Sequence, residues 1–384
     1  MKIQELLEEM IRRDSSDIYI TAELPPMYRT EGITERWGDK ELTFDDTKAL
    51  AYEAMSDRQI AEFEVSKEMN LALFYPELGR FRVNIFYQRG NVGMVIRQIK
   101  LEIKTIDDLK LPSILKDIIM TKRGLVLVVG ATGSGKSTTL AAMIEHRNAN
   151  SPGHIISIED PIEFVHPHKK SVITQREVGF DTHSFGDALR NTLRQAPDVI
   201  LIGEIRDVET MEAAITFAET GHLCLGTLHA NNANQAIERV INFFPIERHP
   251  QVYLLLSLNI RAIVSQRLIP TIDGKRAAAM EVLLDTSRVK DLILKEDIGT
   301  LKDAMAGGNQ EGMQTFDQSI FNLYKDGKIS YENAIAYADS ANDLRLRIKM
   351  DSIQDEQQQE QAQGKPGEKK EPAFRIKKDD PYSR

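Results

Sequence analysis

The segment GATGSGKS, residues 130–137, lies between an apolar run and a helical segment. LVLVV comes directly before it and TTLAAMIEHR directly after it, which is the order of strand, loop and helix that a phosphate-binding P-loop requires. In such a loop the backbone amides and the helix N-terminus face the phosphates, a lysine reaches the β- and γ-oxygens, and a hydroxyl ligates Mg²⁺. We therefore predict an α/β core that binds ATP and Mg²⁺. The predicted contacts are Gly130, Ala131, Thr132, Gly133, Ser134, Gly135, Lys136, Ser137 and Thr138, with Ser137 on the metal.

Two further apolar runs of the chain end in carboxylates. A nucleotide hydrolase needs such groups, one for the Mg²⁺ shell and one to orient or deprotonate water. Glu204 follows the run VILIG, so we predict that its carboxylate lies beside the P-loop at the carboxyl edge of the sheet. There it would contact either the metal or the attacking water. Residues 155–158 form another run, followed by EDPIE, in which Pro161 ends the strand. Glu163 is then either a second reacting group or a solvated loop acid.

Histidines flank a third apolar run, residues 223–227. At such an edge a histidine can sense a γ-phosphate, but His222 and His229 are equally well explained as hydrogen-bonded structural residues. The two histidines of VHPHKK, residues 165–170, are expected in an exposed loop.

The pattern of the chain divides it into three regions. Residues 1–104 carry an opening helix, a helix around residues 44–63 and extended segments separated by turns, which predicts a small α/β unit with three antiparallel strands. Residues 105–350 alternate apolar runs with helices, as buried parallel strands do. Residues 351–384 are too polar to form a core, and we predict a disordered tail. The expected strands are residues 17–21, 71–75, 79–88, 92–99, 125–129, 154–159, 199–202 and 223–227.

Composition excludes several classes of function. The net charge of −9 and the pI near 5.5 provide no basic field for a phosphate backbone, so we expect no nucleic-acid partner. Cys224 is the only cysteine, which excludes a multi-cysteine zinc cage and is typical of a small buried side chain in a reducing compartment. No window approaches the roughly 18 apolar residues of a membrane span, so we expect a cytoplasmic protein that is at most peripheral to a membrane.

Four segments carry a family resemblance: GATGSGKST, SIEDPIEFVH, RQAPDVILIGEIRD and TGHLCLGTLHANNA. In this order they resemble the Walker A, Asp, Walker B and His boxes of the secretion ATPases of the type II and type IV pilus class. The likeness covers residues 1–345, and within the class the chain is similar to the twitching-motility branch, the PilT/PilU family. The resemblance implies a PAS-like α+β domain followed by a RecA-like P-loop ATPase domain, in a hexameric ring with ATP between subunits.

The resemblance also implies roles for individual residues. These are Glu163 as general base, Glu204 as a Mg²⁺-shell or water-positioning group, His222 and His229 as sensors of the nucleotide state, and Arg82 and Arg97 as phosphate-reaching residues. The two arginines lie in GRFRVNIFYQRG and GMVIRQIK. Without the resemblance, each arginine is better explained as a surface charge.

Departures from the family pattern favour one branch. Extension and type II secretion relatives carry a longer N-terminal region and a four-cysteine zinc insertion, and this chain has neither, which favours pilus depolymerisation over assembly. The main retraction ATPase has a motif close to AIRNLIRE where residues 299–308 read GTLKDAMAGG. This difference favours an accessory paralogue of that ATPase.

Three functions follow as hypotheses. We expect a hexameric, Mg²⁺-dependent ATPase at the cytoplasmic base of a type IV pilus, which helps the main retraction ATPase to withdraw pilin through an inner-membrane platform protein. The alternative is a scaffold subunit that binds nucleotide and a partner ATPase but hydrolyses little itself. A RecA-like motor on nucleic acid is the third hypothesis, and the acidic charge disfavours it.

Overall fold

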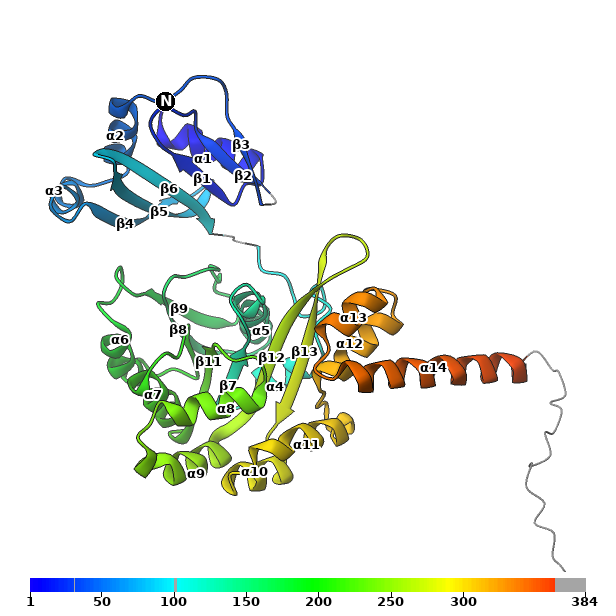
Figure 1. The fold of residues 1–384 in the computed structure, drawn as a ribbon. Coiled ribbons are helices and arrows are strands. Elements are labelled where there is room, and N and C mark those ends of the chain that lie inside the picture. The colour runs from blue at the N-terminus through cyan, green and yellow to red at the C-terminus, as the bar shows by residue number, and fades with distance from the viewer. Residues whose placement is uncertain (31, 100–101, 363–384) are drawn as a thin grey trace, which may run out of the picture. The chain divides into compact units, whose positions relative to one another are not determined.

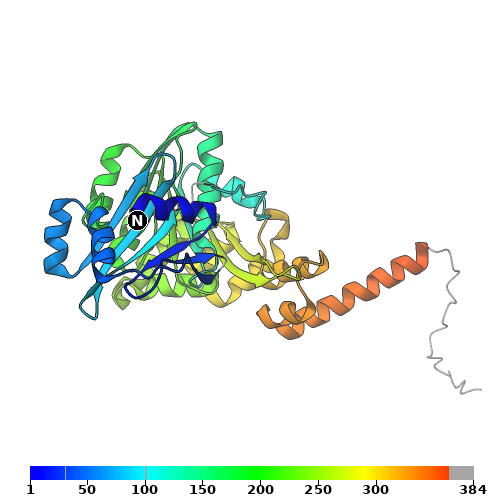
Figure 2. The same cartoon turned by 90° about the horizontal axis from the view of Figure 1, so that it is seen from above.

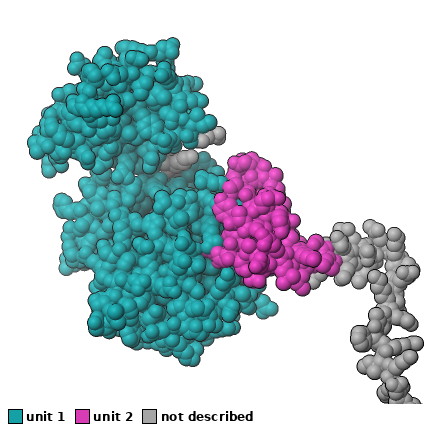
Figure 3. Space-filling model, viewed as in Figure 1, with its two compact units in different colours: residues 1–269, 276–315 teal, residues 270–275, 316–384 magenta. Residues whose placement is uncertain are grey.

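The computed structural model describes residues 1–30, 32–99 and 102–362 (Figure 1). Within them the chain forms a mixed α/β fold with a six-stranded and a seven-stranded sheet. Among the described residues, 270–275 group with 316–362 into a second compact unit, and the others form the first (Figure 3). The domain boundaries expected at residues 104 and 350 stay predictions.

The N-terminal sheet has the strand order β3-β2-β1-β6-β5-β4, with antiparallel neighbours throughout. Its strands are β1 (Asp17–Ile20), β2 (Met27–Thr30), β3 (Ile33–Arg36), β4 (Glu68–Tyr75), β5 (Gly79–Gln88) and β6 (Asn91–Ile99). Helix α1 (Ile3–Arg12) runs along this sheet (Figure 2). Its apolar stripe is buried in the same core as the side chains of the sheet. The three antiparallel strands expected between residues 71 and 99 are confirmed as β4, β5 and β6.

The helix expected around residues 44–63 is two helices, α2 (Phe44–Glu53) and α3 (Asp57–Ser66). Ser56 begins α3, because its hydroxyl accepts the Gln59 amide while the Gln59 side chain accepts the Ser56 amide. Such a capping box starts a new helix regardless of the apolar spacing around it. The sequence pattern does not predict strand β3, because all of its residues are exposed and buried and exposed positions do not alternate along it.

The larger sheet has the strand order β13-β12-β7-β11-β10-β8-β9. Its strands are β7 (Gly124–Val129), β8 (Gly153–Glu159), β9 (Ser171–Glu177), β10 (Val199–Ile202), β11 (Leu223–Leu228), β12 (Ile260–Pro270) and β13 (Arg276–Leu284). Neighbours from β12 through β9 pair in parallel, which confirms the four expected strands β7, β8, β10 and β11. The pattern does not predict β9 or β12, because polar residues interrupt their apolar runs.

Apolar cores cover both faces of this sheet. Leu125, Leu127 and Val129 of β7 join one core, and Val126 and Val128 join the other, as the alternation of a strand requires. Cys224 is fully buried in the first core, as expected. The helices of this part are α4 (Ile114–Met120), α5 (Lys136–Asn150), α6 (Phe185–Thr192), α7 (Val208–Glu219), α8 (Ala233–Asn242), α9 (His249–Asn259), α10 (Ser287–Leu294) and α11 (Leu301–Gly307). Because the strands are parallel, β7, β8, β10 and β11 all end at one edge of the sheet.

The second unit contains the helices α12 (Phe316–Lys325), α13 (Tyr331–Tyr337) and α14 (Ala341–Ala362). The Arg347 guanidinium lies 4.4 Å from the ring centre of Phe321, which joins α14 to α12. Helix α14 continues past Met350 into the segment for which the sequence predicts disorder, because glutamate and glutamine favour helices even where they cannot build a core. Residues 363–384 of that expected tail lie outside the described residues. No described helix has both the length and the apolar character needed to cross a bilayer.

Candidate nucleotide-binding site

The loop of residues 130–137 connects β7 to α5 and takes a backbone path that needs glycine. Gly130, Gly133 and Gly135 have φ values of +155°, +75° and +89°. A Cβ atom at position 130 would lie 2.5 Å from the Ser134 hydroxyl and 2.6 Å from the backbone oxygen of Gln266. The glycine at position 130 therefore serves close packing against β12 as well as loop curvature.

Lys136 and Ser134 give this loop the polar groups that a phosphate needs. The Lys136 ammonium donates to the carbonyls of Gly130 and Ala131 at 2.9 and 3.0 Å. Burial lowers the pKa of Lys136, and the carboxylates of Glu204 and Glu163 oppose that shift. The Ser134 hydroxyl is buried and has no hydrogen-bond partner among the described residues. An ammonium and an unpartnered hydroxyl in a glycine-shaped loop fit the phosphates of a nucleotide.

A cavity of about 470 Å³ lies beside the loop, at the edge where the parallel strands end. It brings together most of the residues that the sequence singles out. These lining residues are Thr132, Gly133, Gly135, Lys136, Ser137, Thr138, Glu163, Glu204 and His229. The Ser137 hydroxyl and the nearby carboxylates are oxygen ligands of the kind that Mg²⁺ prefers, so this residue set fits a magnesium nucleotide.

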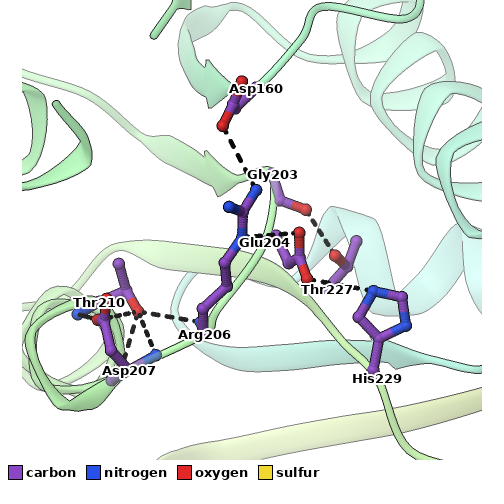
Figure 4. A network of polar contacts seen from close by, with 8 residues as sticks. All are labelled: Asp160, Gly203, Glu204, Arg206, Asp207, Thr210, Thr227 and His229. Atoms are coloured by element: carbon purple, nitrogen blue, oxygen red, sulfur yellow. Dashed lines mark hydrogen bonds and ion pairs between the residues drawn. The ribbon is translucent and has the colours of Figure 1, made fainter. Parts of the chain in front are cut away.

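Glu204 follows β10 and is held by an arginine and a histidine (Figure 4). One of its carboxylate oxygens lies 3.1 Å from His229 Nε2, and the other accepts from Arg206 Nε at 2.8 Å. Arg206 also reaches Asp160, 3.4 Å away, while the Thr227 hydroxyl donates to the Gly203 carbonyl at 2.5 Å. The network ties the ends of β8, β10 and β11 to one another, and Glu204 remains 28% exposed at the cavity.

The segment after β8 places Glu159 deep in the site and Glu163 at its surface. Glu159 accepts from the Ser157 hydroxyl at 2.6 Å and from the Gln175 amide at 3.2 Å. Burial raises the pKa of the Glu159 carboxyl, against these hydrogen bonds and one from the Glu163 amide, which favour the ionised form. The Glu163 side chain is exposed and lines the cavity, where it is accessible to a water molecule.

Three of the predicted residues outside the loop, His222, Arg82 and Arg97, do not line this cavity. His222 precedes β11 and His229 follows it, so the six residues of the strand separate them by about 20 Å. The His222 ring instead lies 3.1 Å from the Thr220 hydroxyl. Arg82 and Arg97 face each other across β5 and β6, and Arg97 donates to Asp17 at 2.7 Å. The roles of these three residues at a nucleotide stay predictions.

Gln266 is a site residue that the sequence pattern misses. It is 3% exposed on β12, and its side chain accepts from the Thr139 hydroxyl at 2.7 Å on the first turn of α5. The amide nitrogen of Gln266 lies 2.8 Å from the position of a Cβ on Gly135. The sequence carries one signal that could have identified Gln266: two adjacent polar residues, Ser265 and Gln266, interrupt an apolar strand. Through these contacts, Gln266 supports the end of the phosphate loop and the start of α5.

His166 corrects an expectation, because it is buried and not an exposed loop residue. It is 9% exposed, lines the cavity, and donates its backbone amide to the Gln175 side chain at 2.8 Å. Burial lowers its pKa from 6.5 to about 4, although Glu145, 4.0 Å from the ring nitrogen Nδ1, works in the opposite direction. The ring is therefore neutral in the folded chain at pH 7.

Titration of His166 is expected to make the folded state less stable in acid. Between pH 6.5 and about 4 the unfolded chain binds a proton at this residue that the folded chain does not bind, so the free energy of unfolding falls as the pH drops. Replacing His166 with glutamine should remove up to about 1.4 kcal/mol per pH unit from this slope, as measured by urea denaturation at several pH values. A slope in His166→Gln equal to that of the wild type would contradict the prediction.

Comparison with known proteins identifies the family. Residues 1–325 match the model of the type II/IV secretion system protein family, and the chain belongs to this family. The type IV pilus ATPase PilU of Pseudomonas aeruginosa is 55% identical over 356 residues, which cover 92% of this chain and 93% of that protein. The type IV pilus retraction ATPase PilT of the same organism is 43% identical, over 87% of this chain and 97% of that protein. The family expected from the four boxes is thereby confirmed.

The fold agrees with a solved structure of the same family. The crystal structure of the pilus retraction motor PilT with bound ADP matches with a TM-score of 0.84 and 43% identity, and covers 90% of this chain and 99% of that one. The mixed α/β arrangement expected from the sequence is thus confirmed over the part of the chain that the match covers.

Proposed function

We propose that the chain is a Mg²⁺-dependent ATPase that helps to power type IV pilus retraction, as an accessory paralogue of the main retraction ATPase. The observation that carries the proposal is the cavity shared by Lys136, Glu163, Glu204 and His229. The 55% identity to a type IV pilus ATPase supports the choice of system.

The proposal includes the architecture that such a motor needs. Residues 1–104 form a PAS-like domain and residues 105–350 a RecA-like P-loop ATPase domain, six copies assemble into a ring, and ATP binds between neighbouring copies. Arg82 and Arg97 then reach the phosphates held by the adjacent subunit, and His222 responds to the nucleotide state from the far end of β11. Their positions outside the cavity of their own chain are compatible with action on a neighbour.

Five residues of the cavity have a task in the proposed reaction. When bound, Mg²⁺ offsets the charge of the phosphates. Lys136 exchanges its loop carbonyls for phosphate oxygens, and the Ser137 hydroxyl and Glu204 supply metal ligands, Glu204 partly through water. Glu163 accepts the proton of the attacking water, and His229 follows the state of the site through its contact with Glu204.

In the proposed cycle, ATP closes each second domain against the first domain of its neighbour, and hydrolysis loosens that contact. The motion acts on an inner-membrane platform protein, from which pilin subunits are withdrawn. The chain works at the cytoplasmic side of the pilus base, peripheral to the inner membrane, beside the main retraction ATPase.

Steady-state ATPase activity of the purified chain tests the proposal. We expect turnover that requires Mg²⁺ and is lost on replacing Lys136 with alanine. The Lys136 ammonium is the positive charge with which the loop binds the phosphate oxygens. Turnover that persists in excess EDTA, or in the Lys136 variant, would contradict the assignment.

A nucleotide-binding scaffold with little hydrolysis of its own is the second candidate. It is favoured by residues 299–308, which depart from the motif of the main retraction ATPase. The same assay separates the two, because a scaffold binds ATP without turning it over and raises the turnover of an added retraction ATPase.

A further inference from the structure

Gln175 on β9 makes hydrogen bonds to three residues around Glu163. Its amide nitrogen donates to the Glu159 carboxylate at 3.2 Å and to the Phe164 carbonyl at 2.9 Å. Its amide oxygen accepts the backbone amide of His166 at 2.8 Å. One side chain thus holds the segment both before and after Glu163.

Glu163 itself depends on this framework for its position. Its backbone amide bonds to the Glu159 carboxylate, which Gln175 holds from the other side. On the preceding residue, the Ile162 amide donates to the buried Glu177 carboxylate at 3.3 Å, and Glu177 lies two positions after Gln175 on the same face of β9. The Glu163 backbone is therefore fixed by its neighbours, and its side chain is left exposed at the cavity.

We propose that Gln175 is the positioning residue for Glu163. The inference rests on the proposed function, in which Glu163 takes a proton from the attacking water. Gln175 contacts neither the phosphate loop nor Glu204, and it is not among the residues that line the cavity. Loss of its hydrogen bonds should therefore misplace the base without weakening the hold on the phosphates.

Replacing Gln175 with methionine keeps the length of the side chain and removes all three hydrogen bonds. We expect kcat for ATP to fall on the order of 10-fold, with KM and the Kd for a fluorescent ATP analogue within about 2-fold of the original values. The same replacement at Gln251, which is exposed on α9, is the matched control and should change none of these quantities. Hydrogen exchange should become faster in residues 160–166 and stay unchanged in residues 130–137.

A double replacement distinguishes positioning from general support. Glu163→Gln alone should lower the single-turnover rate about 100-fold, and adding Gln175→Met should lower it no further, because the base on which Gln175 acts is already absent. If Gln175→Met lowers the melting temperature, Gln175→Asn replaces it in the test, since it keeps an amide at this position but is one methylene too short to make the three hydrogen bonds together. The same loss in kcat is expected.

The possible results separate this inference from the proposed function. Three results would overturn the positioning role while leaving the ATPase in place. The first is an unchanged kcat in the Gln175 variants, and the second is a loss of ATP affinity as large as the loss in kcat. The third is a further fall of about 10-fold in the single-turnover rate when Gln175→Met is added to Glu163→Gln. A wild-type chain without turnover, or full turnover in Glu163→Gln, would overturn the proposed reaction first.

Discussion

Replacing Glu204 with alanine is expected to lower the kcat for ATP by about 1000-fold. The change removes the carboxylate that both His229 and Arg206 contact and that faces the Lys136 ammonium across the cavity. Arg206 keeps a partner in Asp160, 3.4 Å away, but His229 loses the contact that holds its ring beside the site. The metal shell and the attacking water are then both less ordered, whereas the phosphate loop is untouched.

Turnover with saturating MgATP, compared with binding of a fluorescent ATP analogue, measures this effect. ATP affinity should stay within about 10-fold of the wild type, so that the loss falls mainly on kcat. Glu219→Ala is the matched control, because Glu219 is exposed at the end of α7 and should leave kcat unchanged. Turnover within a factor of about 2 of the wild type in Glu204→Ala would remove this residue from the proposed reaction.

Residues whose role depends on nearby sequence could be predicted. The strand, the loop and the helix of the phosphate site are contiguous, so their order alone indicates the cradle around Lys136. Glu204 follows from the same logic, because the residue that ends a buried parallel strand must lie at the carboxyl edge of the sheet.

Residues whose role depends on distant partners could not be predicted. Gln266 supports the loop through Thr139, which lies 127 positions earlier in the chain, and no local pattern connects the two. Gln175 and His166 meet only because β9 pairs with β8 and brings the following segment against it. His222 and His229 flank one strand and look equivalent in the sequence, but the length of that strand leaves only His229 beside Glu204.

Replacing Gly130 with alanine is expected to weaken nucleotide binding by at least about 100-fold and to lower the free energy of unfolding by about 1–3 kcal/mol. The Ser134 hydroxyl, 2.5 Å from the new methyl group, can rotate away, but the Gln266 backbone oxygen at 2.6 Å cannot. That oxygen belongs to β12, whose Ser265 pairs with Val129 of β7 directly before the loop. Relief of the overlap must therefore move the loop and misdirect its amides, or push two paired strands apart.

Gly38→Ala separates this packing effect from the cost of adding a methyl group at a glycine with positive φ. Gly38 has a φ of +74° and nothing within 4 Å of a Cβ, so its replacement should cost about 1 kcal/mol or less and leave nucleotide affinity unchanged. Urea denaturation and titration with the fluorescent analogue report the two quantities for both variants. Wild-type affinity in Gly130→Ala would mean that the loop adopts another backbone path when phosphate is bound, because the path seen here leaves no space for the methyl group.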